Sequence, residues 1–230
     1  MRPPLFYTEL MQETDVAAVR QIDRECFGTP WAAITYLREL RSPATCHYLV
    51  ARCKDGTQKV SPKAQGSGFL QTLATLLFGA SNSDPLAGDL LVGYGGLWFG
   101  VDEVHITTLA VAPTYQGHGI GELLLNGLID QTLTQEIDLL TLEVRVSNVV
   151  GQNLYRKYGF EVMGKRRHYY TDDGEDALIM TTPSLRQPAY QAQLKKNRQK
   201  LKARLANQAK NFPKTLAKQP ETGGSIKYLL

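Results

Sequence analysis

The sequence predicts one domain of mixed α/β class, and three observations support this. Strand-like and helix-like stretches alternate through the first 183 of the 230 residues. One stretch, 107–125, has the pattern of a strand, a proline-marked turn, a glycine-rich loop and an apolar helix. With 43% hydrophobic and 21% charged residues, the chain has the composition of a soluble globular protein that buries one core.

The N-terminal part is expected to form two helices followed by two strands. Thr14 and Asp15 can cap a helix whose apolar residues recur at helical spacing up to Phe27. A second helix is predicted from Thr29-Pro30, because proline suits a first helical turn, and it runs to the break at Ser42-Pro43. The strands that follow are predicted at 47–52 and 90–99.

An insertion separates these two strands. Residues 54–88 are rich in Gly, Ser, Pro, Gln and Ala, and they far exceed the roughly two to five residues of an ordinary hairpin loop. An apolar patch, 69–78, lies within the insertion. It predicts either a short amphipathic helix packed on the body or a contact with a partner or a membrane.

The C-terminal part of the domain is expected to alternate again. The expected order is strand 105–111, helix 121–133, strand 139–146, helix 148–158 and strands 160–164 and 177–181. Gly159 fits the left-handed residue that ends a helix. Asp172-Asp173-Gly174 predicts the turn between the last two strands.

The glycine-rich loop predicts an anion-binding site. Gly117, Gly119 and Gly121 let a ligand approach the backbone, and the helix that follows offers unpaired N–H groups and a favourable dipole to a pyrophosphate. The spacing is not the G-x-G-x-x-G of dinucleotide-binding folds, and no Gly-Lys-Ser/Thr follows, which excludes a P-loop. A tight turn without a ligand is the alternative.

Five motifs in order resemble those of the GNAT acetyltransferases. Gln116-x-x-Gly119-x-Gly121 resembles their acetyl-coenzyme A loop, Q/R-x-x-G-x-G/A. Two segments, LEVRVSN at 142–148 and NLYRKYGF at 153–160, resemble those of protein N-terminal acetyltransferases, and two, FGTPW at 27–31 and RRHYYTDDGEDA at 166–177, resemble the RimI branch. The FGTPW segment departs from the branch pattern F-P-W by an insertion before the proline. The resemblance covers residues from about 5 to 183, without the insertion.

The resemblance implies a fold and a reaction. The expected GNAT fold is a mixed, mostly antiparallel twisted sheet flanked by helices. The expected activity is transfer of acetyl from acetyl-CoA, without a metal, to a protein N-terminal amine, with the N-terminal alanine of a small-subunit ribosomal protein as acceptor. The alternatives are another acceptor, an internal lysine or a small amine, and an inactive protein that binds acyl-CoA and regulates.

Two side chains are predicted to be catalytic. Glu143 lies in an otherwise apolar strand and matches the general base of the family. Tyr155 matches the tyrosine that donates a proton to the departing sulfur in the family. A phenol suits this role because it stays protonated near neutral pH. The alternatives are a solvent-facing glutamate on an edge strand and an ordinary core tyrosine. Tyr169 and Tyr170 are expected either to line the pocket of the acceptor residue or to be an exposed hairpin pair.

Three groups of residues are expected to bind acetyl-CoA. The strand 109–111 would offer backbone groups to the pantetheine and the thioester oxygen. The loop would cradle the pyrophosphate, and Asn148 would hydrogen-bond the pantetheine, cap a helix, or both. His118 also reads as a solvent-facing loop residue. The full predicted set is Leu109, Ala110, Val111, Gln116, Gly117, His118, Gly119, Ile120, Gly121, Glu122 and Asn148.

The charge distribution divides the chain at residue 184. Residues 1–183 carry 15 Lys/Arg and 21 Asp/Glu, whereas 184–230 carry 11 Lys/Arg and only Glu221. The sequence therefore predicts an acetyltransferase domain, 1–183, and a basic, flexible tail, 184–230, although Tyr190, Leu194, Leu201 and Leu205 form a loose helical stripe. Such a tail either solubilises the protein or binds ribosomal RNA or another polyanion.

The remaining features predict a cytoplasmic protein, for which a monomer is expected although the sequence does not determine the oligomeric state. No apolar run approaches the ~20 residues of a membrane span, and the N-terminus lacks the apolar region of a signal peptide. Cys26, Cys46 and Cys53 form no C-x-x-C pair, which predicts free thiols rather than a disulfide framework or a zinc site.

Overall fold

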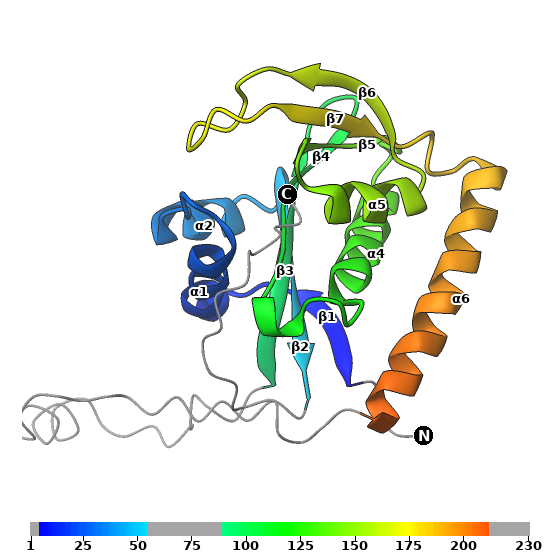
Figure 1. Ribbon diagram of the computed structural model, residues 1–230, viewed down its shortest axis with the longest axis horizontal. Helices are drawn as coiled ribbons and strands as arrows, with labels where there is room; N and C mark the ends of the chain where they lie inside the picture. The colour runs from blue at the N-terminus through cyan, green and yellow to red at the C-terminus, as the bar shows by residue number, and fades with distance from the viewer. Residues whose placement is uncertain (1–4, 55–88, 212–230) are drawn as a thin grey trace, which may run out of the picture.

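The computed structural model describes residues 5–54 and 89–211, which form one seven-stranded sheet with helices on both faces (Figure 1). The strand order is β1-β2-β3-β4-β5-β7-β6, and every neighbouring pair is antiparallel except β4 and β5. The strands are β1 (Phe6–Leu10), β2 (Cys46–Cys53), β3 (Leu90–Phe99), β4 (Val104–Val111), β5 (Leu140–Arg145), β6 (Glu161–Arg166) and β7 (Ala177–Thr181). The helices are α1 (Val16–Cys26), α2 (Ala33–Leu40), α4 (Ile120–Leu133), α5 (Val149–Lys157) and α6 (Pro188–Asn211). The predicted mixed, mostly antiparallel sheet is confirmed.

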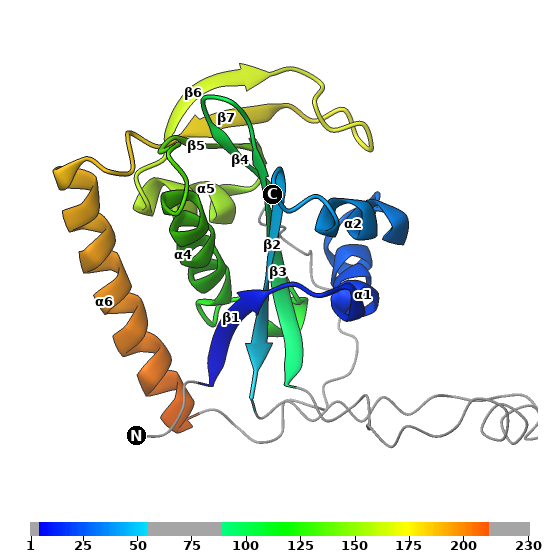
Figure 2. The same cartoon turned by 180° about the vertical axis from the view of Figure 1, so that it is seen from behind.

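Each face of the sheet has its own core. Helices α1 and α2 cover one face, and α4, α5 and α6 lie on the other (Figures 1 and 2). Alternate residues of a strand point to opposite faces, so Leu142 and Val144 of β5 join the core under α4 and α5, while Glu143 faces the other way. The sheet thereby delivers a carboxylate to the face opposite the glycine-loop helix.

Most expected elements are confirmed, and two differ. The helix expected from Thr29 starts at Ala33, because the chain is still extended at Ala32 and the Trp31 N–H donates to the Asp23 carboxylate at 2.8 Å. Strand β1 was not predicted. It is a short edge strand in which only Phe6 is buried, so it lacks a clear alternating pattern. The insertion lies outside the described residues apart from Lys54.

The predicted flexible tail is wrong over α6, which is a helix packed against the body. Tyr190, Leu194 and Leu201, three residues of the predicted stripe, are buried, and Leu205 packs against the same core. The acidic partners that the segment lacks come from α4, where Asp130 pairs with Arg198 at 2.6 Å. Residues 212–230 lie outside the described part of the chain.

Strands β4 and β5 separate shortly after they meet. Their described pairing is confined to Val104 with Leu140 and His105 with Thr141. Just beyond, the register between β3 and β4 shifts at Gly96/Leu97, which leaves Thr107 as an extra residue in β4. A bulge bends its strand, so this one redirects β4 away from β5. The gap between the two strands is where the predicted site residues gather.

Within the described ranges, none of the helices is long and apolar enough to cross a membrane. Cys26, Cys46 and Cys53 form no disulfide, as predicted, and Cys26 and Cys53 are buried.

Candidate active site

The glycine-rich loop borders a cavity of about 400 Å³. Gly117 and Gly119 have φ angles of +78° and +85°, so both occupy the left-handed region that favours glycine. A Cβ on Gly117 would meet no atom within 4 Å, so this glycine leaves open space at the loop surface. The cavity lining includes seven residues of the predicted set, Val111, Gln116, Gly117, Gly119, Ile120, Gly121 and Glu122.

Four other residues of that set do not line this cavity. Leu109 and Ala110 are buried on opposite faces of β4, so their side chains serve the two cores. The His118 ring bonds the Gln116 carbonyl within the loop at 2.9 Å. Asn148 caps α5 by accepting from the Gly151 N–H at 2.9 Å, and its buried Nδ2 finds no hydrogen-bond partner among the described residues. An unpaired buried amide is costly, which fits a ligand that accepts from it.

Glu143 is buried on a central strand rather than exposed on an edge. Its side chain is 8% exposed, and its carboxylate bonds His105 Nε2 at 2.5 Å and pairs with Arg166 at 3.1 Å. Burial alone would raise the pKa of Glu143, but the hydrogen bond and charge of His105 and the charge of Arg166 hold it below its usual value. Glu143 is therefore a carboxylate at neutral pH.

Tyr155 lies fully buried on α5, with its ring 5.5 Å from that of Phe160. Burial and the nearby Tyr170 raise its pKa well above that of a free phenol, so it stays protonated. Its neighbour Leu154 lines the loop cavity, and Tyr170 lines a second cavity that contains Glu143. Tyr155 itself lines neither cavity, but its helix borders the first, and Tyr170, which interacts with it, borders the second.

The second cavity, of about 310 Å³, opens on the other side of the separated strands. Glu143, His105 and Arg145 come from β4 and β5, and Tyr169 and Tyr170 from the β6–β7 hairpin. The segment between α1 and α2 closes it with Phe27, Gly28, Thr29 and Trp31. Tyr169 and Tyr170 therefore line a pocket, which favours the first of their two predicted roles.

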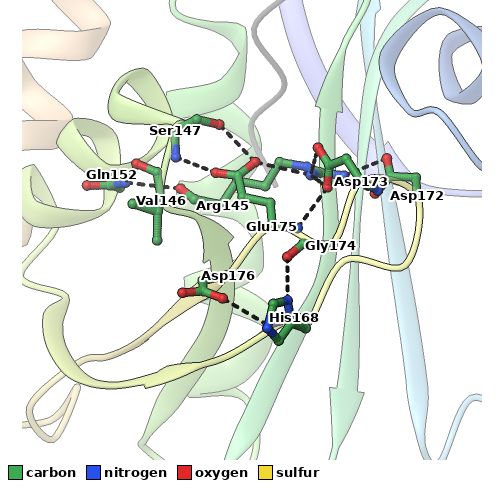
Figure 3. A network of polar contacts seen from close by, with 10 residues as sticks. All are labelled: Arg145, Val146, Ser147, Gln152, His168, Asp172, Asp173, Gly174, Glu175 and Asp176. Atoms are coloured by element: carbon green, nitrogen blue, oxygen red, sulfur yellow. Dashed lines mark hydrogen bonds and ion pairs between the residues drawn. The ribbon is translucent and has the colours of Figure 1, made fainter.

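One arginine fixes the β6–β7 hairpin, and Figure 3 shows its contacts with the hairpin carboxylates. Arg145 donates to Asp172, Asp173 and Glu175 at distances from 2.7 to 3.1 Å, and its guanidinium lies 3.8 Å from the Tyr170 ring centre. Glu175 in turn accepts from the N–H and hydroxyl of Ser147. These charge-assisted bonds hold Tyr170 in place at the pocket wall.

The sequence model of the acetyltransferase (GNAT) family matches residues 16–160, which hold β2 to β5, the glycine loop and α5. The chain belongs to the GNAT acetyltransferase family. The match includes both Glu143 and Tyr155, and it ends before α6.

Relatives of this GNAT enzyme share most of its length. A Bacillus subtilis protein, provisionally named [ribosomal protein bS18]-alanine N-acetyltransferase, is 34% identical over 74% of this chain and 90% of its own. The crystal structure of the Escherichia coli ribosomal-protein-S18-alanine N-acetyltransferase is 25% identical, with a TM-score of 0.56, over 78% of this chain and 94% of that chain. A Salmonella typhimurium protein, provisionally named an acetyltransferase, shares the fold, and its structure holds acetyl-CoA. It is 18% identical, with a TM-score of 0.56, over 80% of this chain and 96% of that chain.

Three residues of this GNAT enzyme's candidate site were not predicted from the sequence. His105 contacts Glu143 across 38 residues of sequence, and no motif marks it. Arg166 belongs to a quoted motif, but its pairing with Glu143 requires the β6–β7 hairpin to fold over β5. Arg204 of α6 lines the loop cavity. Arg204 follows the buried Leu201 by three residues and the buried Asn197 by seven, so it lies on the packed face of α6. This helical spacing is the sequence signal that could have indicated Arg204.

Proposed function

We propose that this chain transfers the acetyl group of acetyl-CoA to the N-terminal amine of a protein, and that the acceptor is the N-terminal alanine of a small-subunit ribosomal protein. One observation carries the proposal: the Glu143 carboxylate lines the second cavity just beyond the point where β4 and β5 separate, and the glycine-loop cavity lies on the other side of these strands. Both the Bacillus subtilis and the Escherichia coli relatives carry names with that acceptor.

Glu143 is assigned as the general base. A protein α-amino group has a pKa near ~8, so a fair fraction is neutral at neutral pH, whereas lysine at ~10.4 is almost wholly protonated. One ionised carboxylate, acting directly or through a water, can then accept the proton released by the attacking amine. His105 and Arg166 keep Glu143 ionised for this role. The low proton affinity of Glu143 suits an α-amine better than a lysine side chain.

Tyr155 is assigned as the general acid, and acetyl-CoA supplies the activated acetyl thioester. A buried phenol keeps its proton over the physiological range and can give it to a thiolate as it leaves. The β4 backbone at 109–111 would bind the thioester oxygen and the pantetheine, and Asn148 Nδ2 would donate to the same arm. The loop amides of 117–121 would hold the pyrophosphate.

The test is acetyl transfer to a peptide that begins with alanine and carries the N-terminal sequence of the host's bS18 protein. We expect release of the CoA thiol and, by mass spectrometry, a single acetyl group on the α-amino nitrogen. The same peptide with a formylated N-terminus and an internal lysine should not react. Acetylation of the lysine instead would favour the alternative acceptor, and binding of acetyl-CoA without transfer would favour the inactive, regulatory protein.

We also propose that α6 offers a cationic surface to ribosomal RNA or another polyanion. Lys195, Lys196, Lys200 and Lys202 are exposed on this helix, which contains no acidic residue. Clustered cations attract polyanions at long range and raise the local concentration of a bound substrate. Because α6 packs on the body, deleting everything after Pro183 would also remove core residues and cannot test this.

Replacing these four lysines with glutamine isolates the charge. We expect unchanged thermal stability and unchanged activity on a short peptide. Activity on small ribosomal subunits that carry the unacetylated acceptor should fall at low salt, and the difference should shrink as salt rises. Arg24→Gln, which removes an exposed cation from the opposite face, is the control. Equal activity of the quadruple variant and the wild type on both substrates at low salt would contradict the proposal.

A further inference from the structure

The loop cavity contains a carboxylate where a phosphate is expected to bind. Glu122 lies in the first turn of α4, it is 5% exposed, and it lines the same cavity as Gly117, Gly119 and Gly121. A carboxylate at a helix N-terminus is favourable for the helix, but beside a pyrophosphate it repels the ligand. The site therefore requires cations that offset Glu122.

Two cations do so, and they come from different elements. Lys157, at the end of α5, donates to Glu122 Oε1 at 2.5 Å, and Arg204 of α6 donates to Oε2 through Nη2. Burial opposes ionisation of Glu122, but hydrogen bonds from Lys157, Tyr158 and Arg204 hold its pKa below the usual value. Two cations against one carboxylate give the cluster a net positive charge, with Glu122 and Arg204 in the cavity wall and Lys157 behind it. Without Arg204 the cluster would be neutral.

Arg204 also lies directly against the loop. A Cβ on Gly119 would be 2.7 Å from Arg204 Nη2 and 3.2 Å from Nε, so the guanidinium covers the α-carbon of this glycine. Its single described hydrogen bond occupies Nη2, and its side chain is 43% exposed. A guanidinium has five N–H donors and suits phosphate recognition. Leu201, one turn earlier, is buried and anchors this part of α6.

We infer that Arg204 is a phosphate-binding residue for acetyl-CoA, and that α6 is therefore a structural part of the coenzyme site. The inference rests on the proposed use of acetyl-CoA. It goes beyond the family resemblance, because Arg204 lies outside the matched residues 16–160. The position over Gly119 assigns Arg204 to the pyrophosphate rather than to the 3′-phosphate.

The test is calorimetric titration of the full chain with CoA, with dephospho-CoA, which lacks the 3′-phosphate, and with acetyl-pantetheine, which has no phosphate. Arg204→Ala should weaken CoA and dephospho-CoA binding equally, by about tenfold or more, as for a lost charge-assisted hydrogen bond. Arg204→Lys should recover part of the loss, and acetyl-pantetheine binding should not change.

Arg198→Ala is the matched control, because Arg198 lies on the same helix and pairs with Asp130 and Asn126 of α4, away from the loop. It should keep wild-type affinity for CoA. An equal loss in both variants would mean that Arg204 only secures α6, and a loss confined to CoA would assign it to the 3′-phosphate; either result overturns the inference. Wild-type protein that binds no CoA would instead refute the proposed function.

Discussion

Glu143→Gln and Tyr155→Phe are each expected to lower kcat by about 10²- to 10⁴-fold, the usual contribution of a general acid or base. Each change keeps the shape of the side chain and removes its proton chemistry, and Glu143→Gln also removes the charge that pairs with His105 and Arg166. Affinity for CoA should change little, because neither side chain lines the loop cavity. Steady-state kinetics with the alanine peptide, together with calorimetric titration, would measure both effects.

The pH profile distinguishes this role of Glu143 from a structural one. The pKa of Glu143 lies below its usual value, so the carboxylate is already ionised at mildly acidic pH. The rise of kcat/KM toward neutral pH should therefore follow the acceptor amine, near ~8, rather than the carboxylate. In Glu143→Gln, kcat/KM should be low at neutral pH and rise only at alkaline pH, where the neutral amine and hydroxide are more abundant.

Tyr190→Phe is a control for the loss of a buried hydroxyl. Tyr190 is 4% exposed, and its hydroxyl finds no hydrogen-bond partner among the described residues. The variant should retain wild-type kcat. If Glu143→Gln and Tyr155→Phe also retained near-normal kcat across neutral pH, both catalytic assignments would be wrong.

The sequence predicted those parts of the site that one continuous segment encodes. The run from β4 through Gly117, Gly119 and α4 is local: the proline, the glycines and the apolar spacing determine its turns within about fifteen residues. The end of α5 at Gly159 was predictable for the same reason, and its φ of +81° confirms the left-handed residue there.

Interactions between distant segments were not predictable in this way. The environment of Glu143 depends on His105 and Arg166, which reach it only because β4, β5 and the β6–β7 hairpin share one sheet. The prediction for α6 is wrong because the charge balance of the segment leaves out the partners that it meets on the folded body. The apolar stripe of α6 packs against the core of the body. Arg198 and Arg204 of α6 pair with Asp130 and Glu122 of α4.

Gly119→Val is expected to weaken CoA binding by more than tenfold and to lower the free energy of unfolding by about 1–3 kcal/mol. Gly119 has a φ of +85°, which a β-branched residue strongly disfavours. Its Cβ would also collide with the Arg204 guanidinium, which must move and release Glu122. Calorimetric titration with CoA and urea unfolding would measure the two losses.

Gly174→Val separates backbone strain from damage to the site. Gly174 has a similar φ of +71°, but its nearest neighbour for a new Cβ is His168 Nδ1 at 3.7 Å, on the hairpin away from the loop. This variant should lose stability and keep its affinity for CoA. Unchanged CoA affinity in Gly119→Val would mean that the loop is only a tight turn.

A double-mutant cycle between Gly119→Val and Arg204→Ala tests whether the collision is real. With the guanidinium removed, the valine meets only the backbone penalty, so the stability cost of Gly119→Val should be smaller in the Arg204→Ala background than in the wild type. CoA affinity should show the same non-additivity, because each single change already disrupts the same pairing of Arg204 with the loop. Strict additivity in both measurements would mean that Arg204 and Gly119 act independently, contrary to their contact in the structure.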